Sequence, residues 1–214
     1  LSAGEILIDG ITVQDWPLQA LARRRAVLLQ DSELSFPFTV LDVVLMGRSA
    51  FNGGVETPHD LEIADAALER VGLAAFTTRR YTNLSGGERQ RVHLARVLAQ
   101  VWQDHEATDV PSTTRYLLLD EPTASQDLAA QHRVLSSARE FADRGGVVIS
   151  VLHDLNQVAQ YADQVVLLSG GQVVSQGSPR AVLTPPTIEA VYGVPIHVIE
   201  RPELDHPLII SCPN

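Results

Sequence analysis

Residues 116–123 read YLLLDEPT, a mostly apolar run followed by two acids. A short apolar run is typical of a buried strand, and this one would deliver Asp120 and Glu121 at its carboxyl end. That edge is where open α/β sheets bind their ligands. An acid there can hold Mg²⁺ through water, and its neighbour can orient or deprotonate an attacking water. The alternative interpretation is a strand that ends in a solvated acidic turn.

The residues after this strand alternate between helix and strand patterns. Helices are predicted at residues 128–144 and 155–161, and strands at residues 147–152 and 165–168. Such alternation favours a parallel sheet with crossover helices. Further on, the sequence predicts a hairpin around Gly170-Gly171 into residues 172–175, short helices that start at Ser178-Pro179 and at Thr187, and two short strands within residues 196–210.

The residues before the strand divide into an N-terminal part and a helical part. The first part is predicted to contain a hairpin at residues 5–13 around Asp9-Gly10, a helix capped by Asp15 that runs to Arg24, and a strand at residues 26–29 that ends at Gln30. A helical subdomain is predicted over about residues 31–100. It would contain a helix from Thr39 to Met46, stopped by Gly47, and a helix at residues 59–71, ended by Gly72. A long helix would follow from Gly87 to about Gln103. Residues 104–114 are polar and predicted to form a surface loop.

Residues 84–91, LSGGERQR, open the long helix with a serine and two glycines. The first N–H groups of a helix lack intrahelical partners and lie at its positive end, so they favour an anion such as phosphate. Gly86 and Gly87 would let such a ligand approach the backbone closely. A serine and a glycine alone would indicate only an ordinary N-cap, but the full octapeptide points to an anion site.

Composition and charge narrow the function classes. The 214 residues carry a net charge of −10, which argues against a general nucleic-acid binder. Arg23-Arg24-Arg25 is a candidate basic patch, although a solvated helix end is the favoured interpretation. No apolar run approaches the ~20 residues of a membrane helix, and the single cysteine, Cys212, cannot build a disulfide framework. We therefore expect a protein of the reducing cytosol that reaches a membrane only through a partner.

The octapeptide at residues 84–91 resembles the signature of the ATP-binding cassette (ABC) ATPase family, LSGGQ or LSGGE followed by QR, and residues 116–123 resemble its Walker B pattern. The resemblance covers the whole chain and implies a single α/β domain over residues 1–214, with a P-loop NTPase-like core, a mostly parallel sheet, flanking helices and the helical subdomain. It also implies an ATPase that uses ATP and Mg²⁺. Two copies would form a homodimer, in which Ser85, Gly86, Gly87 and Glu88 bind the ATP held on the opposite copy.

The resemblance also assigns roles to residues outside the signature. Asp120 would serve Mg²⁺, and Glu121 would be the catalytic carboxylate. His153 follows the strand at residues 147–152 and matches the family's switch histidine, which contacts the γ-phosphate. Gln30 matches the Q-loop glutamine, which senses Mg²⁺ and the attacking water. Asp127 matches the nucleotide-contacting D-loop.

Two features depart from the family's pattern. In the D-loop, Ser125-Gln126-Asp127, Gln126 stands where the family usually has an apolar residue, so local packing is expected to differ. The sequence also has no G-x-x-x-x-G-K-[ST] segment, whose lysine and backbone hold the β- and γ-phosphates, and all sixteen of its basic residues are arginine. We therefore expect the chain to begin after the P-loop helix and to be inactive in this form.

Within the family, the chain most resembles importer ATPases that serve iron chelates, cobalamin and haem, and haemin importers in particular. Residues 36–48, 92–102 and 191–195 and the polar loop before residue 116 carry this likeness. It implies a subunit at the cytoplasmic face of the inner membrane that works with transmembrane permease subunits and, indirectly, with a periplasmic substrate-binding protein, without nucleic acid. Two alternatives stay open: a non-catalytic remnant of such a subunit, and a soluble ABC protein outside transport.

Overall fold

The computed structural model describes residues 4–30, 34–102, 113–124 and 126–212. The chain divides into two compact units, Leu1–Val151 and Leu152–Asn214, and each contains its own hydrophobic core. Most of the loop predicted at residues 104–114 and Ser125 of the predicted D-loop lie outside the described residues. Within the described ranges, every helix is too short or too polar to cross a bilayer.

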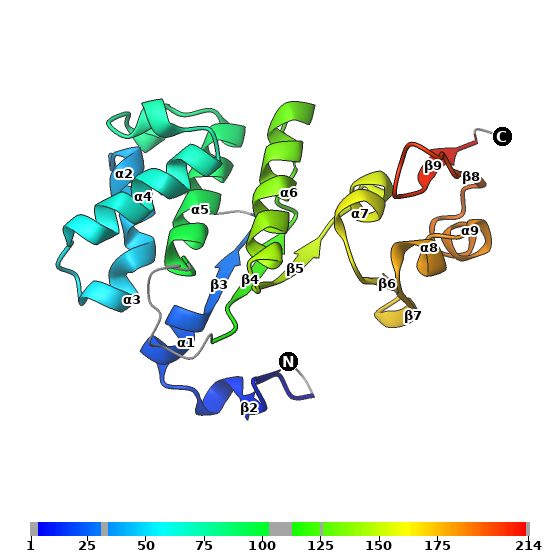
Figure 1. Cartoon of the computed structure of the whole chain (residues 1–214), viewed down its shortest axis with the longest axis horizontal. Helices are drawn as coiled ribbons and strands as arrows, with labels where there is room; N and C mark the ends of the chain where they lie inside the picture. Colours follow the sequence, from blue (N-terminus) through cyan, green and yellow to red (C-terminus); the bar gives the residue numbers. More distant parts are fainter. Residues whose placement is uncertain (1–3, 31–33, 103–112, 125, 213–214) are drawn as a thin grey trace. The chain divides into compact units, whose positions relative to one another are not determined.

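A three-stranded parallel sheet forms the centre of the first unit (Figure 1), which confirms the predicted sheet type. Its strands are β3 (Arg25–Leu28), β4 (Tyr116–Asp120) and β5 (Val147–Val151), in the order β3-β4-β5. In β4 the alternate residues Leu117 and Leu119 are buried, because successive side chains of a strand point to opposite faces. The helix α6 (Leu128–Asp143) connects β4 to β5 and packs Val134, Ala138 and Phe141 into the same core.

The N-terminal hairpin consists of β1 (Leu7–Ile8) and β2 (Ile11–Thr12), as predicted. Its turn residues Asp9 and Gly10 both have positive φ, which is the geometry of a tight two-residue turn. The short 3-10 helix η1 (Val13–Asp15) and the helix α1 (Leu18–Arg24) follow. The predicted N-cap at Asp15 is wrong: Pro17 holds that position, and the Asp15 carboxylate instead accepts a hydrogen bond from the hydroxyl of Thr12, the residue before η1.

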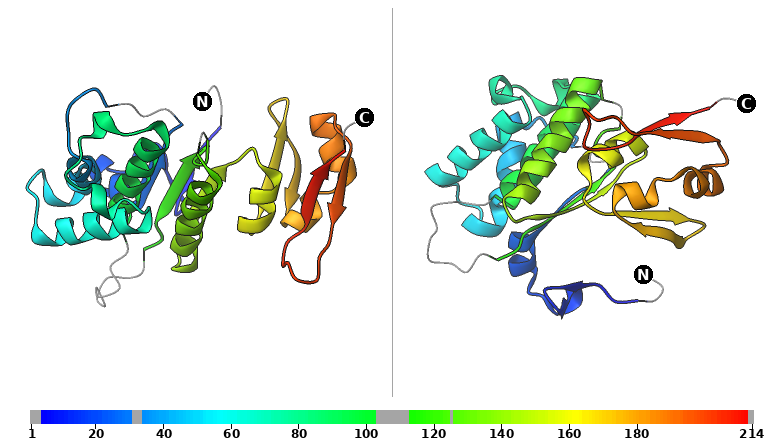
Figure 2. Two further views of the ribbon diagram at one scale, coloured as in Figure 1. Left: turned by 90° about the horizontal axis from the view of Figure 1, so that it is seen from above. Right: turned by 45° about the vertical axis from the view of Figure 1, so that its right-hand side comes forward.

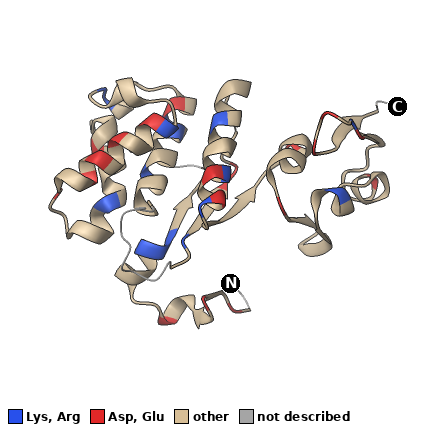
Figure 3. Ribbon diagram, in the orientation of Figure 1, with Lys and Arg blue, Asp and Glu red and all other residues tan. Residues whose placement is uncertain are grey.

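Three consecutive arginines span the end of α1 and the start of β3, where Figure 3 shows a basic stretch. Arg23 donates to the Ala50 carbonyl at 2.8 Å, and Arg24 forms an ion pair with Asp9 at 2.9 Å. These contacts tie α1 to the helical part and to the hairpin. Arg23 is exposed and both arginines lie in the last turn of α1, in keeping with the interpretation of a solvated helix end.

The helical part of the first unit surrounds a core of aliphatic residues. Its elements are α2 (Val40–Leu45), η2 (Met46–Arg48), α3 (Ser49–Asn52), α4 (Pro58–Arg70), η3 (Ala74–Phe76), η4 (Tyr81–Asn83) and α5 (Gly86–Gln100). Capping boxes start both α2, at Thr39, and α4, at Thr57. The prediction that Gly47 stops a helix is wrong, since the chain continues through η2. Gly47 instead allows close packing, because a Cβ there would lie 2.2 Å from the Arg96 carbonyl of α5.

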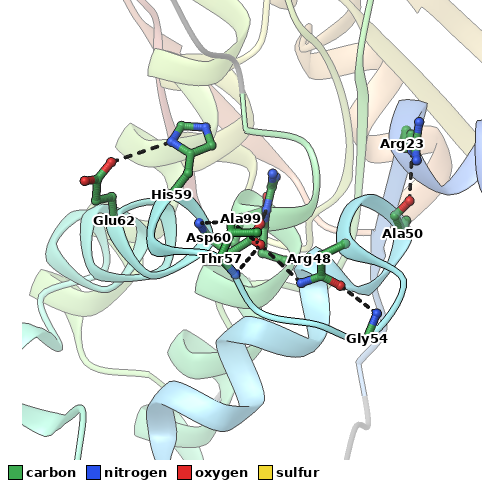
Figure 4. Close-up of polar contacts among 10 residues, drawn as sticks. Arg23, Arg48, Ala50, Gly54, Thr57, His59, Asp60, Glu62 and Ala99 are labelled. Carbon is green, nitrogen blue, oxygen red and sulfur yellow. Dashed lines mark hydrogen bonds and ion pairs between the residues drawn. The ribbon is translucent and has the colours of Figure 1, made fainter.

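A buried ion pair joins these helices (Figure 4). The Arg48 Nε atom lies 2.8 Å from the Asp60 carboxylate, and both side chains are almost fully buried. Arg48 also donates to the Ala99 carbonyl of α5 at 2.9 Å, and Thr57 donates to Asp60. Burial alone raises the pKa of Asp60, but the hydrogen bonds from Arg48 and Thr57 outweigh burial and hold that pKa far below its usual range.

The second unit is built from two antiparallel strand pairs and three short helices (Figure 2). These are α7 (Leu155–Tyr161), β6 (Val165–Ser169), β7 (Gln172–Gly177), α8 (Pro179–Val182), α9 (Pro185–Tyr192), β8 (Ile196–Ile199) and β9 (Leu208–Ser211). The predicted hairpin and tail strands are confirmed. One detail is wrong: α9 begins at Pro185 rather than Thr187, because Thr184 takes the N-cap position.

Candidate functional site

The carboxyl edge of the parallel sheet brings two predicted residues together. Gln30 follows β3, and Glu121 follows β4, which is the neighbouring strand. The Gln30 Nε2 atom donates to Glu121 Oε2 at 2.8 Å, although 91 positions separate the two residues in sequence. This contact exists because parallel pairing places the ends of β3 and β4 at the same edge.

The backbone of Glu121 has a left-handed conformation, with φ of 47°. This region costs a non-glycine residue about 1–2 kcal/mol, so surrounding contacts must maintain it. The Glu121 N–H donates to the Val151 carbonyl of β5 at 3.2 Å, and the Glu121 carbonyl accepts from Gln90 Nε2 of α5 at 3.0 Å. The sheet and α5 together therefore hold the backbone of Glu121.

The opening of α5 carries the predicted signature residues. Ser85 is the N-cap, and its hydroxyl oxygen accepts from the Glu88 N–H. The Glu88 carboxylate in turn accepts from the Ser85 N–H at 2.7 Å and from the Ser85 hydroxyl at 2.8 Å. These hydrogen bonds, the backbone one first, hold the pKa of Glu88 below its usual value. Glu88 is thus engaged with its own helix end, where it orients Ser85.

The first turn of α5 is open to a ligand. A Cβ placed on Gly86 would meet nothing within 4 Å, and Ser85 and Gly86 are exposed. The N–H groups of Gly86 and Gly87 occupy the first helical positions, which have no intrahelical acceptors. This open, donor-rich and positive end fits a phosphate group.

The other two acids predicted for the site, Asp120 and Asp127, differ in their contacts. Asp120 ends β4 and is half-buried, opposite Val151 in the register. Asp127 is exposed and caps α6 by accepting from the Ala130 N–H at 2.8 Å. Across the described residues, no three His, Cys, Asp or Glu side chains gather into a metal cage. A single carboxylate such as Asp120 still fits Mg²⁺, which usually keeps several waters and binds one or two carboxylates plus phosphate oxygens.

His153 belongs to the second unit. It is exposed and directly precedes Asp154, which caps α7 by accepting from the N–H groups of Asn156 and Gln157. The contacts that join Gln30, Glu121 and the α5 opening all lie within the first unit. The predicted role of His153 therefore stays a prediction.

Two glutamines of the site were not predicted to take part in it. Gln126 Nε2 donates to Gln90 Oε1 at 3.0 Å and to the Pro122 carbonyl at 2.9 Å. Gln90 Nε2 in turn donates to the Glu121 carbonyl. The sequence marked Gln126 only as a departure from the family's pattern. No periodicity could have shown that its amide faces α5.

Comparison with known proteins identifies the family. The family model described as ABC transporter matches residues 1–124, which is more than half of the chain. A hemin import ATP-binding protein of Gloeobacter violaceus is 49% identical over 97% of this chain and 74% of its own length. Proteins of the same name from Deinococcus radiodurans and Myxococcus xanthus are 48% and 46% identical, each over 98% of this chain and over 79% and 76% of their lengths.

Solved structures agree with this assignment. A metal-chelate type ABC transporter in an inward-facing conformation superposes with a TM-score of 0.72 at 30% identity, over 88% of this chain and 72% of the other. A bacterial Atm1-family ABC exporter with ATP bound gives a TM-score of 0.65 at 28% identity, over 85% of this chain and 30% of the other. The fold predicted from the sequence is confirmed. With its sheet edge, its signature helix and these relatives, the chain belongs to the ABC transporter family, as an ATPase subunit.

Proposed function

We propose that this subunit hydrolyses ATP to drive haemin import, with Glu121 as the carboxylate that orients and deprotonates the attacking water. The position of Glu121 carries the proposal. Its carboxylate accepts from Gln30 at 2.8 Å at the ligand-binding edge of a parallel sheet, and its carbonyl accepts from Gln90 of the helix that Ser85 opens. Hydrogen bonds in one unit thus link the proposed base, Glu121, to the amide of Gln30, which can orient water, and to the anion-binding helix that Ser85 opens.

The other site residues would divide the remaining tasks. Ser85, Gly86 and Gly87 would donate to the γ-phosphate of ATP held by a second copy, since their helix end is open and positive. Asp120 and Gln30 would hold Mg²⁺, which neutralises phosphate charge when bound.

Three residues would act at the margins of this site. Glu88 would keep Ser85 oriented through the capping box. Asp127 would present the start of α6 to the nucleotide. His153 would contact the γ-phosphate from the second unit.

The proposed partners are a second copy of the chain and transmembrane permease subunits at the cytoplasmic face of the inner membrane. A periplasmic substrate-binding protein would act indirectly, on the permease. The segment after Gln30 would dock on the permease, and the exposure of Phe36, at 68%, supports this. No nucleic-acid partner is proposed, in keeping with a net charge of −10.

The choice of haemin rests on the relatives. Three proteins named for hemin import are 46–49% identical to nearly the whole chain. The fold alone sets no direction of transport, because an exporter structure also superposes on it.

Hydrolysis is tested with Glu121→Gln in a chain that also carries a P-loop segment, called the intact protein below, reconstituted in vesicles with its permease subunits. We expect kcat to fall by about 10²–10⁴, the usual contribution of a general base, while Mg-ATP still binds. Asp143→Asn, at an exposed site on α6, is the control. Full turnover by Glu121→Gln would refute the proposed base, and an intact parent that binds no Mg-ATP would support the non-catalytic alternative.

Substrate choice is tested in the same vesicles. Binding protein loaded with haemin, cobalamin or a ferric chelate is added in separate arms, and ATP turnover is measured. We expect ATP turnover to rise when the added binding protein carries haemin. Stimulation with cobalamin or a ferric chelate alone would reassign the cargo.

A further inference from the structure

We propose that Gln90 and Gln126 form a clamp that holds Glu121 in its left-handed conformation, and that both are positioning residues for hydrolysis. The clamp is defined by these two glutamines and the carbonyl that they reach. This inference rests on the proposed function, because it matters for catalysis only if Glu121 is the base.

The hydrogen bonds of the clamp run in one direction. Gln126 Nε2 donates to Gln90 Oε1 at 3.0 Å, and Gln90 Nε2 donates to the Glu121 carbonyl at 3.0 Å. Accepting from Gln126 leaves the Gln90 amide only one orientation, with its NH₂ group toward Glu121. Gln126 therefore sets the rotation of Gln90, and Gln90 sets the position of the Glu121 carbonyl.

The loop between β4 and α6 is anchored at both of its ends. Gln126 Nε2 also donates to the Pro122 carbonyl at 2.9 Å, and Gln131 of α6 donates to the Gln126 carbonyl at 3.1 Å. The Ala124 N–H donates to the Glu121 carbonyl at 3.2 Å. The carbonyl that Gln90 reaches is thus the point where the loop and α5 meet.

The choice of glutamine at position 126 has a free-energy cost. Its Oε1 atom is buried and, among the described residues, has no hydrogen-bond partner. A buried acceptor without a partner is unfavourable, and an apolar side chain of similar size would avoid the penalty. We infer that the two hydrogen bonds donated by Nε2 are what this amide contributes.

The clamp also connects the two halves of the proposed site. Gln90 and Ser85 lie on the same rigid helix, and Ser85 is at its open end. A shift of α5 when its first turn meets phosphate would therefore move the Glu121 carbonyl directly. The strained φ of Glu121 makes its side-chain direction sensitive to that movement.

The first test is backbone hydrogen–deuterium exchange of the intact protein without nucleotide. Gln90→Glu keeps the acceptor for Gln126 but loses the donor to Glu121, and Gln126→Leu loses both donated bonds. We expect exchange of the Glu121 and Ala124 amides to become about 3–10-fold faster in each variant, the effect of one lost hydrogen bond. Gln126→Leu also covers the case in which Gln90→Glu fails to fold.

Gln100→Ala is the matched control. Gln100 lies on the same helix and donates to the Ala22 and Arg25 carbonyls at 2.8 and 3.1 Å. Its loss removes two equivalent hydrogen bonds at the opposite end of α5, beside the start of β3, whereas Glu121 follows the end of β4. The Glu121 and Ala124 amides should therefore keep their parental exchange rates. Equal acceleration in all three variants would show general loosening and overturn the clamp, as would unchanged exchange in Gln90→Glu and Gln126→Leu.

The second test separates positioning from folding. In reconstituted transporter, Gln90→Glu should lower kcat about tenfold and leave KM for ATP within about twofold, because the base acts only in the transition state. Gln100→Ala should match the parent. Faster exchange with an unchanged kcat would overturn the positioning role. If the parent itself hydrolyses no ATP, the proposed function is refuted. The clamp is then tested by the exchange rates of the Glu121 and Ala124 amides alone.

Discussion

At the scale of single residues, Glu121 combines a proposed chemical task with an unfavourable backbone. Its φ of 47° lies in the left-handed region, which glycine adopts readily and which is strained for other residues. Hydrogen bonds from its own N–H to β5 and from Gln90 to its carbonyl maintain this conformation. A site that keeps a strained acid rather than a glycine indicates that the carboxylate is needed.

Glu121→Gly and Glu121→Ala should therefore differ in stability. Both remove the carboxylate and its contact with Gln30, but only glycine relieves the strain. We expect the free energy of unfolding of Glu121→Gly to exceed that of Glu121→Ala by about 1 kcal/mol, measured by urea titration. Equal stability of the two variants would mean that the backbone of Glu121 stores no strain.

Gly86→Ala should separate stability from activity. The added Cβ meets no atom within 4 Å, and alanine favours a helix over glycine by up to about 1 kcal/mol. We expect the urea midpoint to stay level or rise, while ATP turnover falls because the methyl group enters the space proposed for phosphate. Unchanged turnover would argue against phosphate contact at this helix end.

At the scale of the elements, the first turn of α4 contains an acid, Asp60, that serves two purposes. Asp60 accepts from the Thr57 N–H in the capping box and also binds Arg48, which reaches α5 through the Ala99 carbonyl. Breaking one partner of a buried pair costs about 3–5 kcal/mol, since the other charge is left uncompensated. The arrangement of η2, α4 and α5 therefore depends on this pair.

The pair predicts a pH dependence of stability. The pKa of Asp60 is lowered in the folded chain, so its contribution is fully present above the ordinary Asp pKa and is lost as pH falls below it. We expect Asp60→Asn to be destabilised by about 3–5 kcal/mol at pH 7 and to show a shallower loss of stability between pH 4 and pH 2 than the parent. Urea midpoints across this pH range measure both effects.

Asp143→Asn provides the control for that prediction. Asp143 pairs with Arg139 on an exposed face of α6, where ion pairs contribute about 0–1 kcal/mol. The urea midpoint of Asp143→Asn should match that of the parent at pH 7 and between pH 4 and pH 2. If Asp60→Asn behaved like Asp143→Asn, the buried pair would not organise the helices.

At the scale of the whole molecule, the chain has two separate cores. One joins the parallel sheet to the helical part, and the other joins α8, α9 and the strands of the second unit. A core substitution should therefore act mainly on its own unit. We expect Leu183→Ala to lower the free energy of unfolding by about 2–5 kcal/mol. Amide exchange should become faster in α8 and α9, while the amides of β4 keep their parental exchange rates.

Leu98→Ala is the reciprocal variant. Leu98 is buried in the first core, so its truncation should speed exchange in α5 and β4 but not in α9. Exchange that accelerates throughout the chain in either variant would show that the two units unfold as one.

Local signals were enough to predict most of the secondary structure. The parallel strands, the long helix that follows Ser85, and the hairpins at Asp9-Gly10 and Gly170-Gly171 were all predicted, because periodicity, caps and turn residues act over a few neighbouring positions. The errors at Asp15 and Thr187 were shifts of helix starts, where a nearby residue took the capping position. The octapeptide at residues 84–91 was likewise enough to indicate the family.

Contacts between distant segments were decided by the tertiary structure alone. The sequence placed Gln30 and Glu121 at the ends of two strands, but only the pairing of β3 with β4 brought them to 2.8 Å. The sequence predicts Gly47 to be a helix stop, but the structure shows that α5 packs too closely against Gly47 for a side chain to fit. The Gln126–Gln90 link and the Arg48–Asp60 pair have the same origin. Such contacts depend on how helices and strands pack in three dimensions, and no local pattern of residues encodes that packing.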